Sequence, residues 1–185
     1  MDTVYIALLR GINVGGKNII KMEQLRQVFE DIGFADVETY IQSGNVLFRT
    51  QESDKSELTD RIEKQLQESF SAGINTLVLT TGDLAETVKN APVNFGAEPA
   101  KFRYDVWFLL PPAQVKDVLS IIRLREGVDF LQAGKNVIYT SRLTSQMSRS
   151  YFPKVMQTPF SKSFTIRNWN TTKKLSELAD FSSKR

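Results

Sequence analysis

Short apolar runs and longer amphipathic stretches alternate along the 185 residues of the chain. The run Val4–Arg10 is apolar at successive positions, so it predicts a strand that is covered on both faces and lies in the centre of its sheet. Apolar side chains recur at helical spacing in residues 21–32, which predicts an amphipathic helix. Gly33 follows and is suited to cap the C-terminus of this helix. In the first half, further strands are predicted at 37–42, 46–50 and 76–80, and further helices at 54–70 and 81–91.

The second half repeats this order after a stretch with Pro92, Gly96 and Pro99, which is typical of a linker. Strands are predicted at 104–110, 128–132, 136–140 and 164–167, and helices after Pro112, at 151–157 and after the candidate N-cap Asn170. The polar residues 141–150 predict a loop, and the final FSSKR predicts a frayed end.

The two predicted hairpins also match residue by residue. The segment YIQSGNVLF at 40–48 corresponds to FLQAG at 130–134 and NVIY at 136–139, with one lysine inserted between them. Repetition of the element order and of the hairpin predicts an internal duplication. We therefore expect an α+β protein with two tandem ferredoxin-like (alpha-beta plait, βαββαβ) units, at 1–92 and 102–185, joined by a linker at 93–101.

Cysteine and histidine are both absent from the chain. Disulfides, thiolate or imidazole metal ligands and the usual Ser-His-Asp and Cys-His nucleophiles are thereby excluded. An enzyme would need carboxylates, Lys, Tyr or a metal held by oxygen. Most acidic residues lie at positions expected for solvated helix faces or caps. The sequence thus leaves enzymatic activity open, favours a protein without it, and indicates no cofactor and no metal site.

Charge and hydropathy place the protein in a broad class. Residues 1–100 carry 9 basic and 15 acidic side chains, net −6, and residues 101–185 carry 15 basic and 6 acidic, net +9. Such asymmetry fits either a basic half that meets polyanions or two halves that attract each other. The apolar run 4–9 is too short for a signal peptide or a membrane span. With cysteine absent, we expect a cytoplasmic protein with no membrane contact.

The glycine-rich segment RGINVGGKN at 10–18 follows the first strand directly. Glycine backbone, amides and two cations at a strand end can bind a phosphate or carboxylate. The spacing matches neither GxGxxG nor a Walker loop, so it does not support a dinucleotide or nucleoside triphosphate site. A purely structural explanation is that the connection needs glycines for its backbone angles. The ligand-binding candidates in this loop are Arg10, Gly11, Asn13, Gly15, Gly16 and Lys17.

Two further polar clusters lie at a turn and at a strand end. Gln42, Ser43 and Asn45 occupy the first hairpin turn, which can require such residues for its own geometry. Arg167, Asn168 and Trp169 end the last predicted strand. Their cation, amide and indole could bind an anion and stack on a ring. Alternatively, Trp169 packs the final helix and Arg167 is solvated.

Three motifs resemble a known family. The opening ALLRGINVGGKN, the hairpin TYIQSGNVLF and the ending RNWNTTKKLSELA are similar to the bacterial proteins grouped as domain of unknown function 1697. This resemblance spans almost the whole chain and implies two tandem α/β plaits. No activity is established for the family, so the resemblance implies motif positions without a mechanism. These positions include all the candidates above except Lys17, together with Gly44, and no recognised motif lies between 145 and 163.

Three functions remain open from the sequence. We expect a protein that binds a small anionic or nucleotide-like ligand at the strand-end loops between the two units. The alternative is a single-stranded nucleic-acid-binding module that uses a sheet face, because VYIALL resembles the shorter motif of RNA-recognition domains while SGNVLFR is a poor match to the longer one. An enzyme without His and Cys is the third. The expected oligomeric state is a monomer or a homodimer, because the edge strands of two copies can pair.

Overall fold

The structure is a computed structural model that describes residues 2–15 and 18–184. Its chain forms two compact units, of which unit 1 comprises Met1–Ala85 and Leu175–Arg185, and unit 2 comprises Glu86–Lys174. This division falls inside two helices, α3 (Thr81–Lys89) and α6 (Trp169–Ser183). The sequence-based boundaries at 92 and 102, with a linker at 93–101 between two units, stay a prediction.

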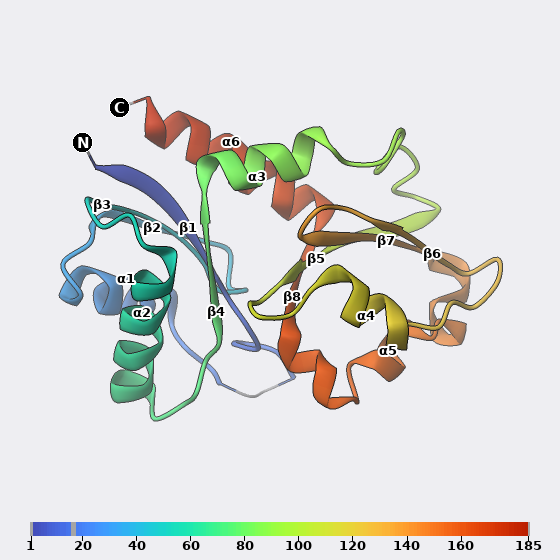
Figure 1. The fold of residues 1–185 in the computed structure, drawn as a ribbon, viewed down its shortest axis with the longest axis horizontal. Helices are drawn as coiled ribbons and strands as arrows, with labels where there is room; N and C mark the ends of the chain where they lie inside the picture. The colour runs from blue at the N-terminus through green and yellow to red at the C-terminus, as the bar shows by residue number, and fades with distance from the viewer. Residues whose placement is uncertain (1, 16–17, 185) are drawn as a thin grey trace. The chain divides into compact units, whose positions relative to one another are not determined.

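Unit 1 contains a four-stranded antiparallel sheet in the order β2-β3-β1-β4 (Figure 1). Strand β1 lies between β3 and β4, and all its residues from Val4 to Leu9 are buried. An apolar run without polar alternation therefore does mark a central strand here. The strands are β1 (Thr3–Leu9), β2 (Ala35–Tyr40), β3 (Asn45–Thr50) and β4 (Thr76–Thr80), and the helices are α1 (Met22–Asp31) and α2 (Lys55–Phe70).

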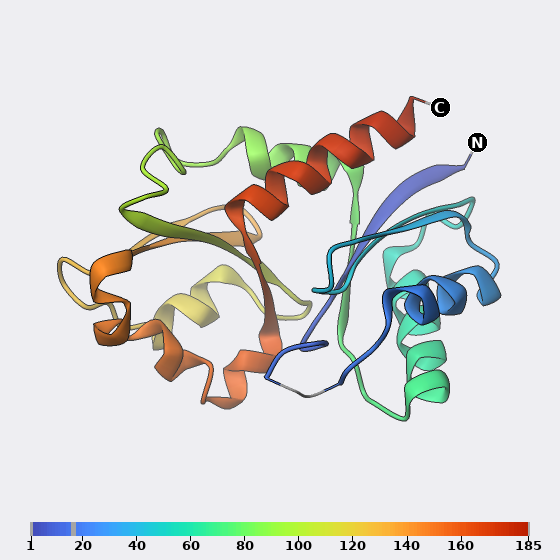
Figure 2. The ribbon, with the colours of Figure 1, turned by 180° about the vertical axis from the view of Figure 1, so that it is seen from behind.

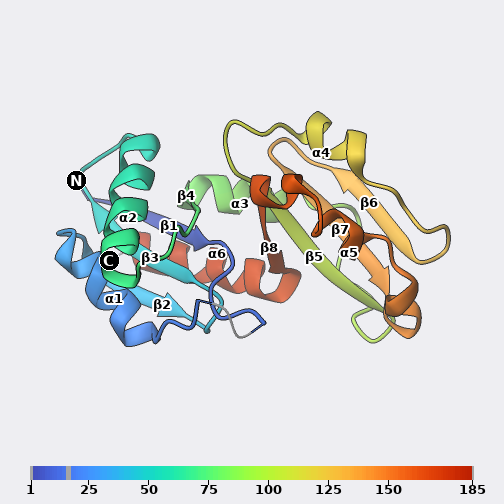
Figure 3. The same cartoon turned by 90° about the horizontal axis from the view of Figure 1, so that it is seen from below.

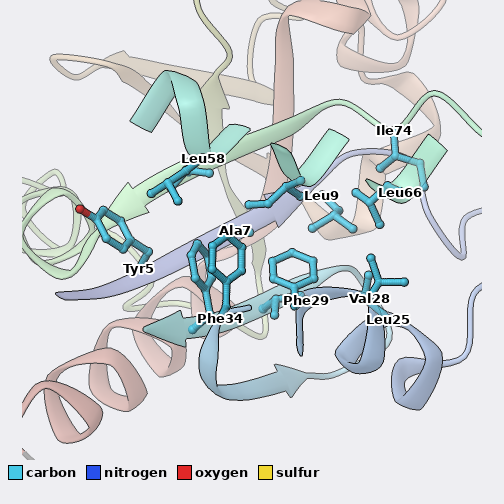
Figure 4. Close-up of a cluster of buried hydrophobic side chains, with 14 of the residues drawn as sticks. Tyr5, Ala7, Leu9, Leu25, Val28, Phe29, Phe34, Leu58, Leu66 and Ile74 are labelled. Atoms are coloured by element: carbon cyan, nitrogen blue, oxygen red, sulfur yellow. The ribbon is translucent and has the colours of Figure 1, made fainter. Parts of the chain in front are cut away.

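The core of unit 1 joins the sheet to α1 and α2 (Figure 4). Phe48 of β3 stacks on Phe34 at 4.4 Å between ring centroids and meets Phe29 of α1 edge-on at 5.6 Å. Helix α2 begins where Asp54 accepts hydrogen bonds from the N–H groups of Ser56 and Glu57. Such a cap replaces the partners that the first turn of a helix lacks.

Unit 2 has a second four-stranded antiparallel sheet, in the order β6-β7-β5-β8 (Figure 3). Each strand takes the place of the unit 1 strand that is numbered four lower, so the two sheets fit two similar units. Its core packs the sheet residues Trp107, Ile138 and Phe164 against Val118 and Phe152 from the helices. The strands are β5 (Phe102–Leu109), β6 (Asp129–Ala133), β7 (Val137–Leu143) and β8 (Phe164–Asn168), and the helices are α4 (Val115–Ile121) and α5 (Phe152–Val155).

Several local sequence predictions are wrong. The segment 141–150 is not a loop, because β7 continues to Leu143 and a 3-10 helix, η1, spans Thr144–Arg149. The first three residues of the FSSKR segment do not fray, because α6 continues to Ser183 and the Arg49 guanidinium donates to the Ser182 carbonyl oxygen; Arg185 lies outside the described residues. A guanidinium at this end compensates the last carbonyls of a helix. None of the helices in the described part of the chain is long and apolar enough to cross a membrane.

The aromatic core generates a stability prediction. Phe48 is 1% exposed and contacts three other rings, so Phe48→Ala should lower the free energy of unfolding by about 3–5 kcal/mol. Urea denaturation followed by circular dichroism measures this change. Phe181→Ala is the matched control, because its ring is 58% exposed, and it should change the free energy by less than about 0.5 kcal/mol. Equal losses in the two variants would contradict the assignment of the core.

Candidate functional site

The end of β1 is held between two other segments of unit 1. The Leu9 N–H donates to the Gly44 carbonyl at 2.8 Å, and the Arg10 N–H donates to the Asn75 carbonyl at 2.8 Å. Beyond Arg10 the chain leaves the sheet, and Ile12 returns one apolar side chain to the core with 1% exposure. The glycine-rich loop is therefore anchored at both its beginning and its first turn.

Asn13 connects this loop to the β2–β3 hairpin. Figure 2 shows the ribbon of both segments, in blue and cyan, from behind. Its Nδ2 donates to the carbonyls of Ile20 at 3.0 Å and Gln42 at 2.9 Å, and its Oδ1 accepts from the Ile20 N–H at 2.8 Å. The Asn13 N–H also donates to the Asn18 carbonyl at 3.0 Å. Because both donors and the acceptor of the amide are engaged, the Asn13 side chain holds the loop and the hairpin together.

The hairpin turn is packed against the same loop. Gly44 has a left-handed φ of +72°, and a Cβ there would lie 2.8 Å from Leu9 Cβ and 2.9 Å from Ile12 Cδ1. Asn45 is fully buried, and its Nδ2 donates to the Tyr40 carbonyl at 3.0 Å and to Ser43 Oγ at 2.9 Å. The predicted binding residue Asn45 therefore serves the turn, in agreement with the structural explanation for this cluster.

Other predicted residues of unit 1 remain accessible at this end of the sheet. Gly11 and Gly15 are exposed and have left-handed φ values of +72° and +60°. Gln42 is exposed, and Ser43 and Arg10 are partly exposed. Through the Asn13 hydrogen bonds, the structure thus brings the first and second predicted clusters together. The predicted residues Gly16 and Lys17 lie outside the described residues.

The third predicted cluster belongs to unit 2, where its residues have structural contacts. Arg167 is 5% exposed, so the interpretation of a solvated Arg167 is wrong. Its Nη1 donates to Thr165 Oγ1 at 2.8 Å and to the Ile166 carbonyl at 2.9 Å. Burial lowers the pKa of the Arg167 guanidinium from its ordinary value to about 10, which leaves it charged at neutral pH.

Asn168 and Trp169 organise the start of α6. Asn168 Oδ1 accepts from the Asn170 N–H at 3.0 Å, so Asn168 and not the predicted Asn170 caps this helix. Trp169 is 7% exposed and meets Phe95 at 5.1 Å between centroids. A Cβ on Gly96 would lie 2.4 Å from the indole. Trp169 is therefore a packing anchor within unit 2, as the structural alternative proposed.

Sequence reasoning missed a charged cluster in the sheet of unit 2. Asp105 is 2% exposed, and its carboxylate binds Arg103 Nε at 2.9 Å and Arg142 Nη2 at 3.1 Å. Asp129 is 4% exposed and its Oδ2 accepts two backbone N–H groups, while Oδ1 has no hydrogen-bond partner among the described residues. The available signal was a single acid inside the apolar run YDVWFLL, because an acid in such a run must be paired when buried.

The placement of acidic side chains and of aromatic rings in the fold bears on metal sites and on the sheet face of unit 1. Within residues 2–15 and 18–184, no three or more acidic side chains form a group that could hold a metal ion. Tyr5 and Phe48, the aromatic residues that suggested an RNA-binding sheet face, are 3% and 1% exposed and belong to the helix-covered core. Rings enclosed in a core cannot stack on bases, so unit 1 lacks this platform.

Gly44 and Gly127 provide a matched pair for testing the contact between loop and hairpin. Both have left-handed φ values, +72° and +71°, but a Cβ on Gly127 meets nothing within 4 Å. Both alanine variants should lose about 1–2 kcal/mol of stability from backbone strain. Gly44→Ala should lose a further 1–3 kcal/mol, roughly, because its Cβ overlaps Leu9 and Ile12. Urea unfolding midpoints compare them, and an equal loss would show that the hairpin is not closed against the loop.

Comparisons with known proteins place the chain in a family. The chain is similar over 97% of its length to 99% of the conserved bacterial protein SP0830 from Streptococcus pneumoniae, with 29% sequence identity and a TM-score of 0.84. No curated protein matches the chain. A family model described as "Protein of unknown function (DUF1697)" matches residues 2–139. Because this match includes more than half of the chain, the protein belongs to the DUF1697 family of proteins of unknown function.

Proposed function

We propose that the protein binds a small anionic, nucleotide-like ligand through residues 10–18 and the hairpin turn 41–45 of unit 1. The observation that carries this proposal is the set of hydrogen bonds made by Asn13 to Ile20 and Gln42. One amide side chain thereby joins two polar motifs that are distant in the sequence. Their accessible groups then lie on two segments that meet at the end of the sheet.

The groups around Asn13 suit an anion. Left-handed glycines such as Gly11 and Gly15 can turn successive backbone N–H groups toward one point, which creates a concave anion-binding surface. The Arg10 guanidinium supplies a charged fork for a phosphate or carboxylate, and Gln42 supplies an amide. These groups supply positive charge and hydrogen-bond donors, so we propose binding rather than catalysis.

Exposed aliphatic side chains favour a ligand with an apolar or planar part. Val14 is 64% exposed, Ile19 is 78% exposed and Ile41 is 49% exposed. Each of them is adjacent in sequence to a residue in the Asn13 hydrogen-bond group. Burying such side chains against a base or another apolar group contributes about 25 cal/mol per Å². This feature supports a nucleotide-like ligand over a bare inorganic anion.

We also propose that the two units are ferredoxin-like plaits derived from an internal duplication. The support is that both sheets have four antiparallel strands and the same order, β2-β3-β1-β4 and β6-β7-β5-β8. In each unit a helix follows the first strand, a hairpin comes next, and helical residues precede the last strand. A shared origin explains why the hairpin residues 40–48 resemble residues 130–139.

Thermal unfolding with separate ligands tests the binding proposal. The full chain is mixed with AMP, ADP, ribose 5-phosphate, pyrophosphate or inorganic phosphate, and calorimetric titration measures the affinity of any compound that raises the melting temperature. A ligand that binds only the native state should add about 2.7 kcal/mol at a hundred times its Kd. A nucleotide should give a larger shift than phosphate. Arg10→Ala should weaken its binding by at least about ten-fold through loss of a charge-assisted contact.

Arg26→Ala is the matched control. Arg26 lies on α1, is half exposed, and pairs with its helical neighbour Glu30. Its removal changes the net charge as Arg10→Ala does but leaves the loop intact, so binding should persist. An equal loss of affinity in both variants, or no shift with any of the five compounds, would overturn the proposal.

A further inference from the structure

The sheet of unit 2 carries a row of aromatic rings on the face turned away from α4 and α5. Trp107 and Leu109 of β5 belong to the helix-covered core. Because side chains alternate along a strand, Phe102 and Tyr104 face the opposite side. On β6, Leu131 packs against the core, so Phe130 faces that opposite side too. The strand register places Phe130 opposite Ser141 and Ser141 opposite Tyr104.

The rings contact one another across the strands. The centroid of Phe102 lies 5.6 Å from that of Phe130 and 6.1 Å from that of Tyr104. Phe95, from the segment before β5, continues the row at 5.0 Å from Tyr104. We call Phe130, Phe102, Tyr104 and Phe95 the aromatic row.

Exposure changes along the aromatic row. Phe95 contacts Tyr139 and Trp169, which are only 2% and 7% exposed, so this end is filled by the protein itself. At the other end Phe130 is 45% exposed, and Phe102 is partly exposed. Ser141 lies on β7, which runs between β5 and β6, and its side chain is small. The rings at the open end therefore stay accessible to solvent. Unit 2 thus fixes the aromatic row by packing its Phe95 end, and it leaves the Phe130 end exposed.

Charge indicates which partner fits. Residues 86–174 contain 14 basic and 6 acidic side chains, which gives unit 2 a net charge of +8. Lys101 Nζ lies 5.1 Å from the centroid of the Phe102 ring, directly at the open end. Its pairing with Glu98, at 3.5 Å, is between exposed groups and is easily exchanged for another anion. Fixed rings combined with a cationic surface are the features that bind single-stranded nucleic acids through stacking and phosphate contacts.

We propose that the open end of the aromatic row binds single-stranded nucleic acid, with bases stacked on Phe130 and Phe102 and a phosphate near Lys101. This binding surface lies in unit 2 and is independent of the ligand proposed for the loop of unit 1. It also differs from the sheet face expected from the sequence, which rested on Tyr5 and Phe48 of unit 1.

Fluorescence anisotropy with labelled oligomers tests this proposal. Oligo(dT) and oligo(U) of about 12 nucleotides, and a duplex of equal length, are titrated with the full chain. Single strands should bind more tightly than the duplex, and affinity should fall by at least about ten-fold between about 50 and about 200 mM salt. Phe130→Ala should weaken single-strand binding by roughly 5-fold to 100-fold, the loss expected for one stacked base. Phe130→Trp should retain it.

Leu124→Ala is the matched control, because Leu124 belongs to the same unit and is 46% exposed. It should bind as the unchanged protein does. Circular dichroism and melting temperatures show that each variant is folded. Equal binding by Phe130→Ala and Leu124→Ala, or a stronger preference for the duplex, would overturn the proposal. The proposal would also be overturned if the protein is a dimer that dissociates in the Phe130→Ala variant and if nucleic acid does not bind. The Phe130 ring would then be packed against a second copy of the chain.

Discussion

The double burial of strand β1 is the constraint on which unit 1 depends. Its side chains from Val4 to Leu9 are buried on both faces, and both of its edges are paired. A strand in this position can contain neither charges nor unpaired polar groups without a large desolvation cost. The polar residues that follow must therefore leave the sheet where Leu9 and Arg10 make their last backbone hydrogen bonds. For this reason the glycine-rich loop lies at the sheet end, where the hairpin turn also lies.

Polar residues in the three motifs have different physical roles, although they look alike in sequence. Asn13, Asn45 and Asn168 use their amides to hold turns, strand ends and a helix start. Gln42 offers only its backbone carbonyl to Asn13 and keeps an exposed side chain. An amide that is saturated by backbone groups stabilises a loop shape, and an exposed one can select a ligand. The loop shape and the binding groups are thus supplied by different residues of the same motif.

Unit 2 places the charged residues of β5 on one face of its sheet and the rings of the aromatic row on the other. Asp105, paired with Arg103 and Arg142, lies on the same face as Trp107, whereas Tyr104 lies on the other face among aromatic rings. Alternation along β5 produces this separation, because neighbouring residues of a strand point in opposite directions. The buried Asp105 pairs with two arginines but neutralises only one positive charge, and the net charge of the unit is +8. The remaining cations leave the unit strongly positive, which favours anionic partners.

The sequence by itself determined the order of the strands, the central position of β1 and the location of α2 near 54–70, because hydrophobic periodicity is a local property of the chain. It also located the candidate loop. Only the tertiary structure decided which motif residues are accessible: Asn45, Arg167 and Trp169 are buried by residues far away in the sequence. The aromatic row was equally hidden from sequence reading, since Phe102 and Phe130 become neighbours only through the register of β6 and β5 with β7. Burial and side-chain contacts depend on how distant segments pack, and a linear pattern does not contain that information.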